Sequence, residues 1–203
     1  MDALVKTKTP FGKRMLIAVA ALAIMGGGFF GYLEIFTKGL DRLPERPCAG
    51  AVARSTVKTL LPDARSAEDR GENTGVGKDF TFFCRVLTSD DHIVSGESDV
   101  QDATSKTWLS GYEQEAGESQ GKLRQGSSGD TKTLTLDRLA SVYVECTPPG
   151  ASPDDALQQY ALITEARVIG DSRVHGSELR EALTEFAVQL SDKAYKVGKC
   201  RKG

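Results

Sequence analysis

Hydrophobic and polar residues divide this chain into an apolar stretch near the N-terminus and a longer region in which the two kinds alternate. The apolar stretch is residues 15–36, and Glu34 is the only formally charged residue among its 22. A helix of that length reaches roughly 33 Å, about the thickness of the hydrocarbon core of a bilayer. The pattern therefore predicts a transmembrane helix.

Basic residues set the expected orientation of this helix. Residues 1–14 contain Lys6, Lys8, Lys13 and Arg14, and basic flanks stay on the cytoplasmic side of a membrane. We therefore expect residues 1–14 to form a short cytoplasmic tail. We likewise expect residues 15–36 to be a signal anchor, 37–47 a proline-containing linker, and 48–203 an extracytoplasmic domain.

A cleaved signal peptide is the alternative for the apolar stretch. The run from Met15 to Met25 suits its hydrophobic region, and Gly26 and Gly28 suit a cleavage site. The apolar run continues to Phe36, however, which favours an uncleaved anchor. Within it, small residues recur every four positions, a spacing that can pair membrane helices. They are Ala23, Gly27 and Gly31, and a weak homodimer is one expectation; the frequency of glycine in membrane helices is the other explanation.

Four strands are expected in the outer domain. In Phe80–Thr88 the residues Phe80, Phe82, Cys84 and Val86 share one face at period two. A more polar strand, His92–Gln101, should return from it nearer an edge of the sheet. The pattern then recurs in the last third of the chain, as Leu139–Thr147 followed by Tyr160–Ile169.

Three helices are expected, at Ala49–Leu61, Thr104–Glu115 and Glu178–Val197. The last has the clearest inner stripe, with Ser177 as its cap and Gly198 at its end. Residues 63–79 are predicted to be a loop, and residues 116–130 a flexible polar insertion.

The elements predict an α+β fold with two strand–strand–helix halves. An antiparallel sheet with the helices packed on one face would bury the apolar sides of both.

All four cysteines lie beyond the anchor, at Cys48, Cys84, Cys146 and Cys200. An even count in an oxidising compartment indicates two disulfides, and the wide spacing disfavours a zinc site. Both strand cysteines should face the helices, which disfavours a bond between Cys84 and Cys146. Locality favours Cys48–Cys84 with Cys146–Cys200, and the crossed pairing is the alternative.

Charge is divided unevenly along the chain. The net charge of −2 combines +3 for residues 1–38 (five basic, two acidic) with −5 for the remainder. An acidic outer domain argues against nucleic acid or an anionic lipid surface as its partner.

The chain resembles a group of uncharacterised actinobacterial proteins with a single N-terminal membrane anchor and a four-cysteine outer domain. The resemblance rests on the segments LPERPC, FCRV and YVECTPPG and on the closing helix that runs to Cys200. It covers most of residues 43–200 and implies the topology above, but it implies no activity.

Candidate chemistry is sparse. His92 follows two aspartates in a predicted turn, and His175 precedes a helix start. The pair Asp154–Asp155 suits the first turn of a helix. Trp108 and Tyr112 could line a ligand groove, although their helical spacing favours a place in the core. We expect no catalytic or metal-binding residues and no cofactor.

The leading functional hypothesis is therefore a membrane-tethered binding or scaffolding module that meets a protein partner in the cell envelope, with no enzymatic activity. A carrier of a lipid or small molecule, with a pocket between helices and sheet, is the first alternative, and an envelope hydrolase is the second.

Overall fold

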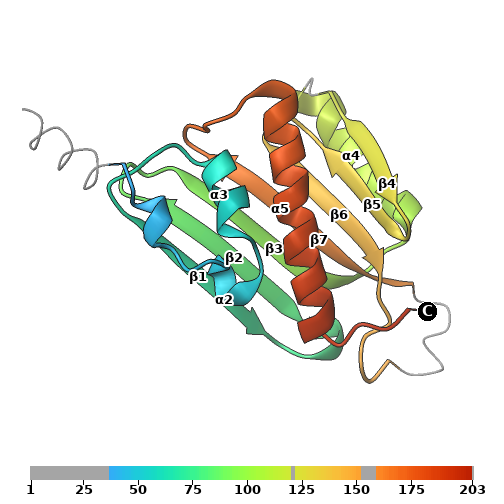
Figure 1. Cartoon of the computed structure of the whole chain (residues 1–203). Helices are drawn as coiled ribbons and strands as arrows, with labels where there is room; N and C mark the ends of the chain where they lie inside the picture. The colour runs from blue at the N-terminus through green and yellow to red at the C-terminus, as the bar shows by residue number, and fades with distance from the viewer. Residues whose placement is uncertain (1–36, 120–121, 152–158, 203) are drawn as a thin grey trace, which may run out of the picture.

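A computed structural model describes residues 37–119, 122–151 and 159–202 (Figure 1). The predicted tail, anchor and small-residue stripe lie outside these ranges. So does Asp154–Asp155. Among the described residues, no helix has the length and apolar character needed to cross a membrane.

The centre of the fold is an antiparallel sheet of seven strands, which confirms the α+β class. Its spatial order is β1-β2-β3-β7-β6-β5-β4. The strands are β1 (Ala67–Thr74), β2 (Thr81–Thr88), β3 (Ile93–Asp102), β4 (Arg124–Ser128), β5 (Thr131–Thr135), β6 (Leu139–Glu145) and β7 (Tyr160–Ile169).

The four predicted strands are present as β2, β3, β6 and β7, and Tyr160–Ile169 has the predicted bounds. The predicted edge position of His92–Gln101 is wrong, because β3 lies between β2 and β7 in the middle of the sheet. Its polar residues Glu97 and Asp99 lie on a sheet face that is only partly covered. The polar residues of β3 therefore indicate a partly exposed face of the sheet and not an edge position.

Two segments predicted to lack structure contain strands. Residues 63–79 include β1, which pairs along its whole length with β2. Residues 116–130 include the end of α4 and all of β4, which pairs with β5. Neither strand has an apolar face, so periodicity could not find them; pairing with a neighbouring strand supplies their hydrogen bonds.

The helices are η1 (Leu40–Arg42), α2 (Pro47–Gly50), α3 (Arg54–Leu60), η2 (Gly77–Asp79), α4 (Ser105–Ser119) and α5 (Gly176–Val197). The helix predicted at Ala49–Leu61 is not continuous: Ala49, inside α2, has a left-handed φ of 55°, and Ala53, just before α3, has an extended backbone (φ −77°, ψ 139°). Ser177 does not cap α5, which begins one residue earlier at Gly176.

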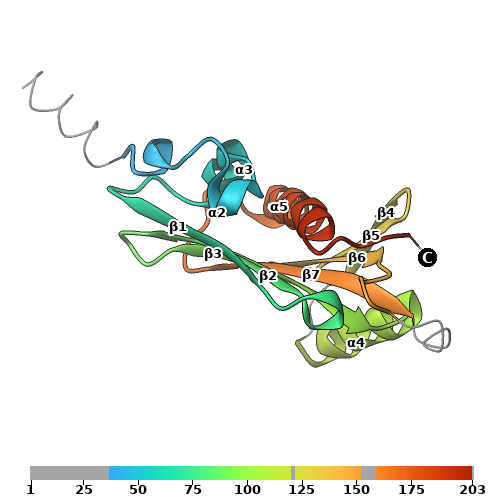
Figure 2. The same ribbon diagram turned by 90° about the horizontal axis from the view of Figure 1, so that it is seen from below.

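Figure 2 shows the largest correction: α2, α3 and α5 lie on one face of the sheet, and α4 lies on the other. The expectation that the helices share one face is therefore wrong. The strand–strand–helix order does occur twice, as β2-β3-α4 and β6-β7-α5. The two helices, however, pack on opposite faces of the sheet. Helical periodicity predicts that one side of α4 is buried without specifying the sheet face that buries it.

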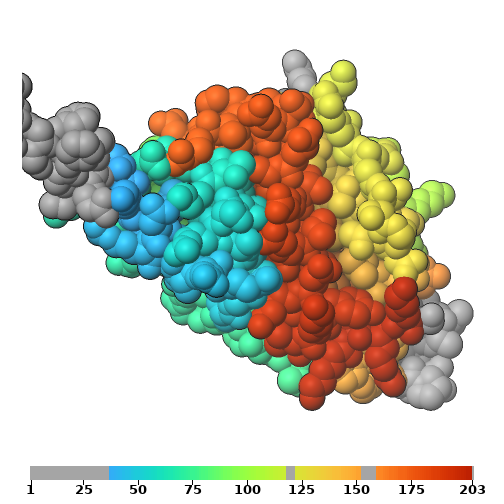
Figure 3. Space-filling view, viewed as in Figure 1, coloured from blue at the N-terminus to red at the C-terminus, as the bar shows by residue number. Residues whose placement is uncertain are grey.

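The main core lies between α5 and the sheet, where α2 and α3 also pack. The inner stripe of α5 predicted from sequence is buried there, including Leu183, Phe186 and Leu190. Gly96 of β3 permits the close approach, because a Cβ at this position would lie 2.5 Å from Leu190 Cδ2. In the space-filling view this face is covered by α2, α3 and α5 (Figure 3).

The two disulfides have the favoured pairing. Cys48–Cys84 ties α2 to β2, and Cys146–Cys200 ties the end of β6 to the segment after α5. Cys84 and Cys146 both belong to the core on the α5 side, as their strand positions predict. The second bond is reinforced by Thr147 and Arg201, whose backbones exchange hydrogen bonds of 2.8 and 3.1 Å.

Candidate binding site beside helix α4

A second, smaller core lies under α4 on the opposite face of the sheet. Trp108 and Tyr112 of α4 pack there against Leu134, Tyr143 and Ile163. The Trp108 indole donates a 3.0 Å hydrogen bond to Ser141 Oγ, and its ring centroid lies 5.4 Å from that of Tyr143. The two aromatic residues are therefore core residues, as their spacing favours.

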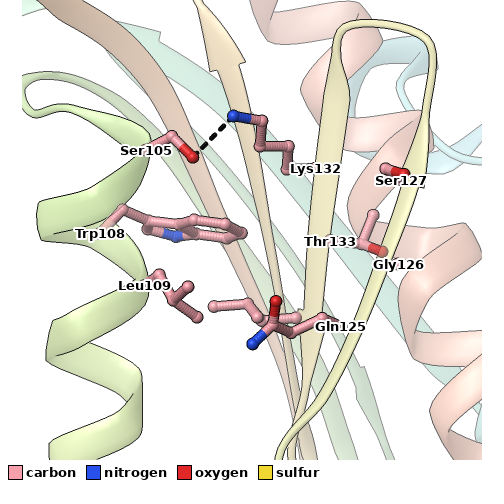
Figure 4. Close-up of a pocket in the computed structure, with 9 residues that line it drawn as sticks. Ser105, Trp108, Leu109, Gln125, Gly126, Ser127, Lys132 and Thr133 are labelled. Atoms are coloured by element: carbon pink, nitrogen blue, oxygen red, sulfur yellow. Dashed lines mark hydrogen bonds between the residues drawn. The ribbon is translucent and has the colours of Figure 1, made fainter.

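Trp108 also lines a cleft at the border of this core, which we call the tryptophan cleft (Figure 4). It has a volume of about 250 Å³ and lies between α4 and the β4–β5 hairpin. Its lining combines an aromatic ring with hydroxyl and amide groups, a mixture that suits recognition of a polar chain. The lining residues are Ser105, Trp108, Leu109, Gln125, Gly126, Ser127, Lys132, Thr133 and Leu134.

Lys132 is the only charged residue among those that line the tryptophan cleft. Its Nζ donates a 2.7 Å hydrogen bond to Ser105 Oγ and lies 5.7 Å from the centroid of the Tyr143 ring. Within the described part of the chain, Lys132 has no carboxylate partner. The cleft therefore has a positive rim with hydroxyl groups beside it.

A second cleft, about 370 Å³, lies on the other side of α4, toward β3 and β7. There the Tyr112 hydroxyl donates a short hydrogen bond to Glu165, whose other carboxylate oxygen accepts a 2.7 Å bond from Arg167. Burial, followed by the hydrogen bond to Glu165, raises the pKa of Tyr112 well above its ordinary value. Tyr112 therefore stays protonated and acts as a hydrogen-bond donor.

Asp99 of β3 lies near this second cleft. Partial burial raises the pKa of the Asp99 carboxyl, the negative charge of Glu165 adds to that effect, and the 2.8 Å hydrogen bond from Gln101 opposes it. The second cleft is thus bordered by carboxylates, whereas the tryptophan cleft is bordered by a lysine.

Strand β4, at the edge of the sheet, forms one wall of the tryptophan cleft. All five of its residues are exposed, and only Arg124 is charged. The hairpin is closed by two residues, with Gly129 at φ +58° in the first position, as a type II′ turn requires. Beyond β4, the described residues provide no further strand.

The histidines have structural positions. Asp171 donates its backbone N–H to His92 Nδ1 at 2.9 Å, so His92 holds the β2–β3 turn against the loop after β7. His175 is the residue before α5, and its side chain does not cap that helix. Neither histidine lines the clefts beside α4. Across the described ranges, no cluster of three or more potential metal ligands occurs.

Sequence reasoning named Trp108 and Tyr112 but missed the other residues of the tryptophan cleft. The alternation Thr131-Lys132-Thr133-Leu134-Thr135-Leu136 was the available signal, because it is typical of a strand with one apolar face. Recognising β5 would have indicated a hairpin partner across Gly129–Asp130, and hence β4.

The comparisons with known proteins add no relative: no family model, no curated protein and no solved structure matches the chain.

Proposed function

We propose that the protein is a membrane-tethered extracytoplasmic module that binds a protein partner in the cell envelope, without catalysis, and that the partner docks at the tryptophan cleft. The apolar stretch 15–36 and the resemblance to anchored actinobacterial proteins support the tether. The two disulfides fit an oxidising compartment outside the cytoplasm.

The observation that carries the binding role is the tryptophan cleft itself. It places an aromatic ring, a lysine that has no carboxylate partner among the described residues, and an exposed edge strand side by side. Protein-binding surfaces are often hollows with an aromatic residue at the centre and a polar rim, and Trp108 has that place here. The core on the α5 side offers less for a partner, because its side chains are already packed under three helices.

A carrier would need its ligand enclosed between helix and sheet. The clefts described above instead lie along the borders of α4, which favours a surface contact over an enclosed ligand. Hydrolysis would need a nucleophile with a neighbouring base, and both histidines lie away from the clefts. These observations favour binding over the two alternatives.

Photo-crosslinking in the cells that make the protein tests this function. A benzophenone amino acid replaces Gln125, on the wall of the tryptophan cleft, in the otherwise natural full chain. The matched control replaces Glu72, an exposed residue of β1 at the other edge of the sheet. We expect protein adducts at Gln125 and none at Glu72. The absence of adducts, or equal adducts at both positions, would contradict the proposal.

A further inference from the structure

We propose that the partner supplies an extended, acidic peptide segment that pairs with β4 as an eighth strand of the sheet. This inference rests on the binding function proposed above and specifies its geometry. Addition of a strand to an exposed sheet edge is a general mode of peptide recognition, in which the backbone supplies affinity and side-chain pockets supply specificity.

The free backbone groups of β4 follow from its pairing with β5. In a hairpin closed by two residues, the flanking pair exchanges both hydrogen bonds, and bonded and non-bonded pairs then alternate. The flanking pair here is Ser128 and Thr131. Ser128, Gly126 and Arg124 therefore bond to β5, whereas Gln125 and Ser127 direct their N–H and C=O groups away from it. Those four backbone groups would hydrogen-bond to an added strand and set its register.

The side chains of β4 leave this edge open to pairing. Edge strands are normally protected by charged residues, proline, bulges or a covering element. β1, at the opposite edge, has four charged residues among its eight: Glu68, Asp69, Arg70 and Glu72. β4 has only Arg124 among its five, and no proline. An open edge of low charge is a template for a further strand.

Each face of β4 has a hollow beside it. Gln125 and Ser127 line the tryptophan cleft on the α4 side. Arg124 lines a groove of about 440 Å³ on the α5 side, which Arg180, Glu181 and Glu185 also line, so both signs of charge are present there. Successive side chains of a strand point to opposite faces. Alternate side chains of an added strand would therefore enter the two hollows in turn.

Charge selects the acidic character of the peptide. Lys132 faces Ser127 across the hairpin and projects on the same side of the sheet as the tryptophan cleft. A residue opposite Ser127 on an added strand lies about 10 Å from Lys132, two strand spacings away. The side chains of a glutamate and a lysine span that distance together. A carboxylate there gives Lys132 the ionic partner that the described residues do not supply.

The test uses the full chain in lipid nanodiscs and a phage library of random linear twelve-residue peptides. Selected peptides are synthesised, and their affinities for the natural protein and its variants are measured. Ser127→Pro removes one outward N–H, and Ser127→Ala is its reference, because it loses the same hydroxyl but keeps the N–H. Lys132→Met removes the charge at similar length. Thermal melts verify that each variant is folded, and Gln125→Pro repeats the backbone test should Ser127→Pro fail to fold.

We expect enriched peptides that contain Asp or Glu. Their affinity should fall at least tenfold in Ser127→Pro relative to Ser127→Ala, and at least fivefold in Lys132→Met. Equal binding by the two Ser127 variants would overturn strand addition, and so would a library that yields no binder. Enriched peptides without Asp or Glu would overturn the acidic class.

Two outcomes separate this inference from the function on which it rests. Suppose that adducts form at Gln125 in cells but that the selected peptides bind Ser127→Pro as tightly as Ser127→Ala. That result would support the binding function and contradict the addition of a strand to β4. A natural chain that is dimeric, with monomeric Ser127→Pro, would show that a second copy occupies β4 and would overturn the peptide partner.

Discussion

The two ends of the sheet are built differently. At the β1 end, α2 packs on the strand so closely that a Cβ on Gly71 would lie 2.3 Å from the Cys48 carbonyl carbon. The Cys48–Cys84 disulfide fastens this contact, and Cys48 donates its N–H to Asp69 Oδ2 at 2.6 Å. At the β4 end, the last strand is exposed along its whole length and has clefts beside it.

The difference separates stability from recognition. Interactions that close the β1 end connect residues far apart in sequence and contribute to the free energy of unfolding. In the proposal above, the open β4 end presents backbone groups and Lys132 to a partner. Substitutions at the β1 end should therefore unfold the domain, whereas substitutions at the β4 end should change binding with small changes in stability.

The largest effect should come from removing the bond that closes the β1 end. Cys48 and Cys84 are separated by 36 positions, and a loop of that length contributes about 4 kcal/mol in the chain-entropy model, as an upper estimate. The variant Cys48→Ala/Cys84→Ala should therefore lose much of a typical domain's stability. Urea denaturation measures it, and a loss below about 1 kcal/mol would contradict a fastened β1 end.

Two strand glycines compare the ends directly. Gly71→Ala forces a Cβ into the Cys48 backbone, which the disulfide holds in place, and should cost about 3 kcal/mol. Gly126→Ala on β4 meets only the Thr133 hydroxyl, at 2.7 Å, which can rotate away. We expect it to cost less than about 0.5 kcal/mol, as for most surface substitutions. Thermal melts of the two variants test the difference, and equal losses would contradict it.

Two prolines test the direction of the β4 backbone groups. Gly126→Pro should break a bond to β5, whereas Ser127→Pro removes only an N–H that faces outward. Measured against the alanine variants at the same positions, Gly126→Pro should be the more destabilising by about 2 kcal/mol. Denaturation curves provide the comparison. A larger loss for Ser127→Pro would reverse the assigned alternation.

The smallest effect concerns Asp99, on the central strand between the two ends. Its folded-state pKa is raised, chiefly by burial, so the folded chain holds this proton more tightly than the unfolded chain. Protonated Asp99 therefore contributes to the free energy of unfolding. This contribution is fully present below the pKa of the unfolded chain, near 3.8, and is lost as the pH rises through the pKa of the folded chain. Asp99→Asn should therefore stabilise the protein slightly at pH 7, because burial disfavours the charged carboxylate but not the neutral amide.

That gain should vanish near pH 3. The control is Asp102→Asn, which removes the same charge from an exposed position on β3. Melting temperatures across this pH range distinguish the variants. A gain for Asp99→Asn that does not exceed the control at pH 7 would contradict the assigned cause.

Sequence patterns predicted the strands and the helix that form the centre of the main core well. The strands β2, β6 and β7 have apolar faces at period two, and α5 has an apolar stripe at helical spacing. The disulfide pairing followed from the faces of Cys84 and Cys146 and from locality. These elements are recognisable because each buries one side against the main core.

Strands without an apolar face were harder to predict, at both ends of the sheet: β1 and β4 were both expected to be loop. Strand β4 has no apolar face and is held in the sheet by its pairing with β5, so its composition resembles that of a loop. The tryptophan cleft is assembled from α4 and this hairpin. Trp108 could be named from sequence, whereas Gln125, Ser127 and Lys132 could be placed only once the hairpin was known.

Fluorescence of Trp108 tests the binding end most directly, because Trp108 is the single tryptophan of the chain and lines the tryptophan cleft. Acrylamide quenching is measured on the full chain in nanodiscs, with and without a saturating selected peptide, and Ser127→Pro serves as the control. We predict that the peptide lowers the quenching constant at least twofold in the natural protein and leaves it unchanged in Ser127→Pro. Quenching unaffected by a bound peptide would place the binding surface elsewhere and contradict the account.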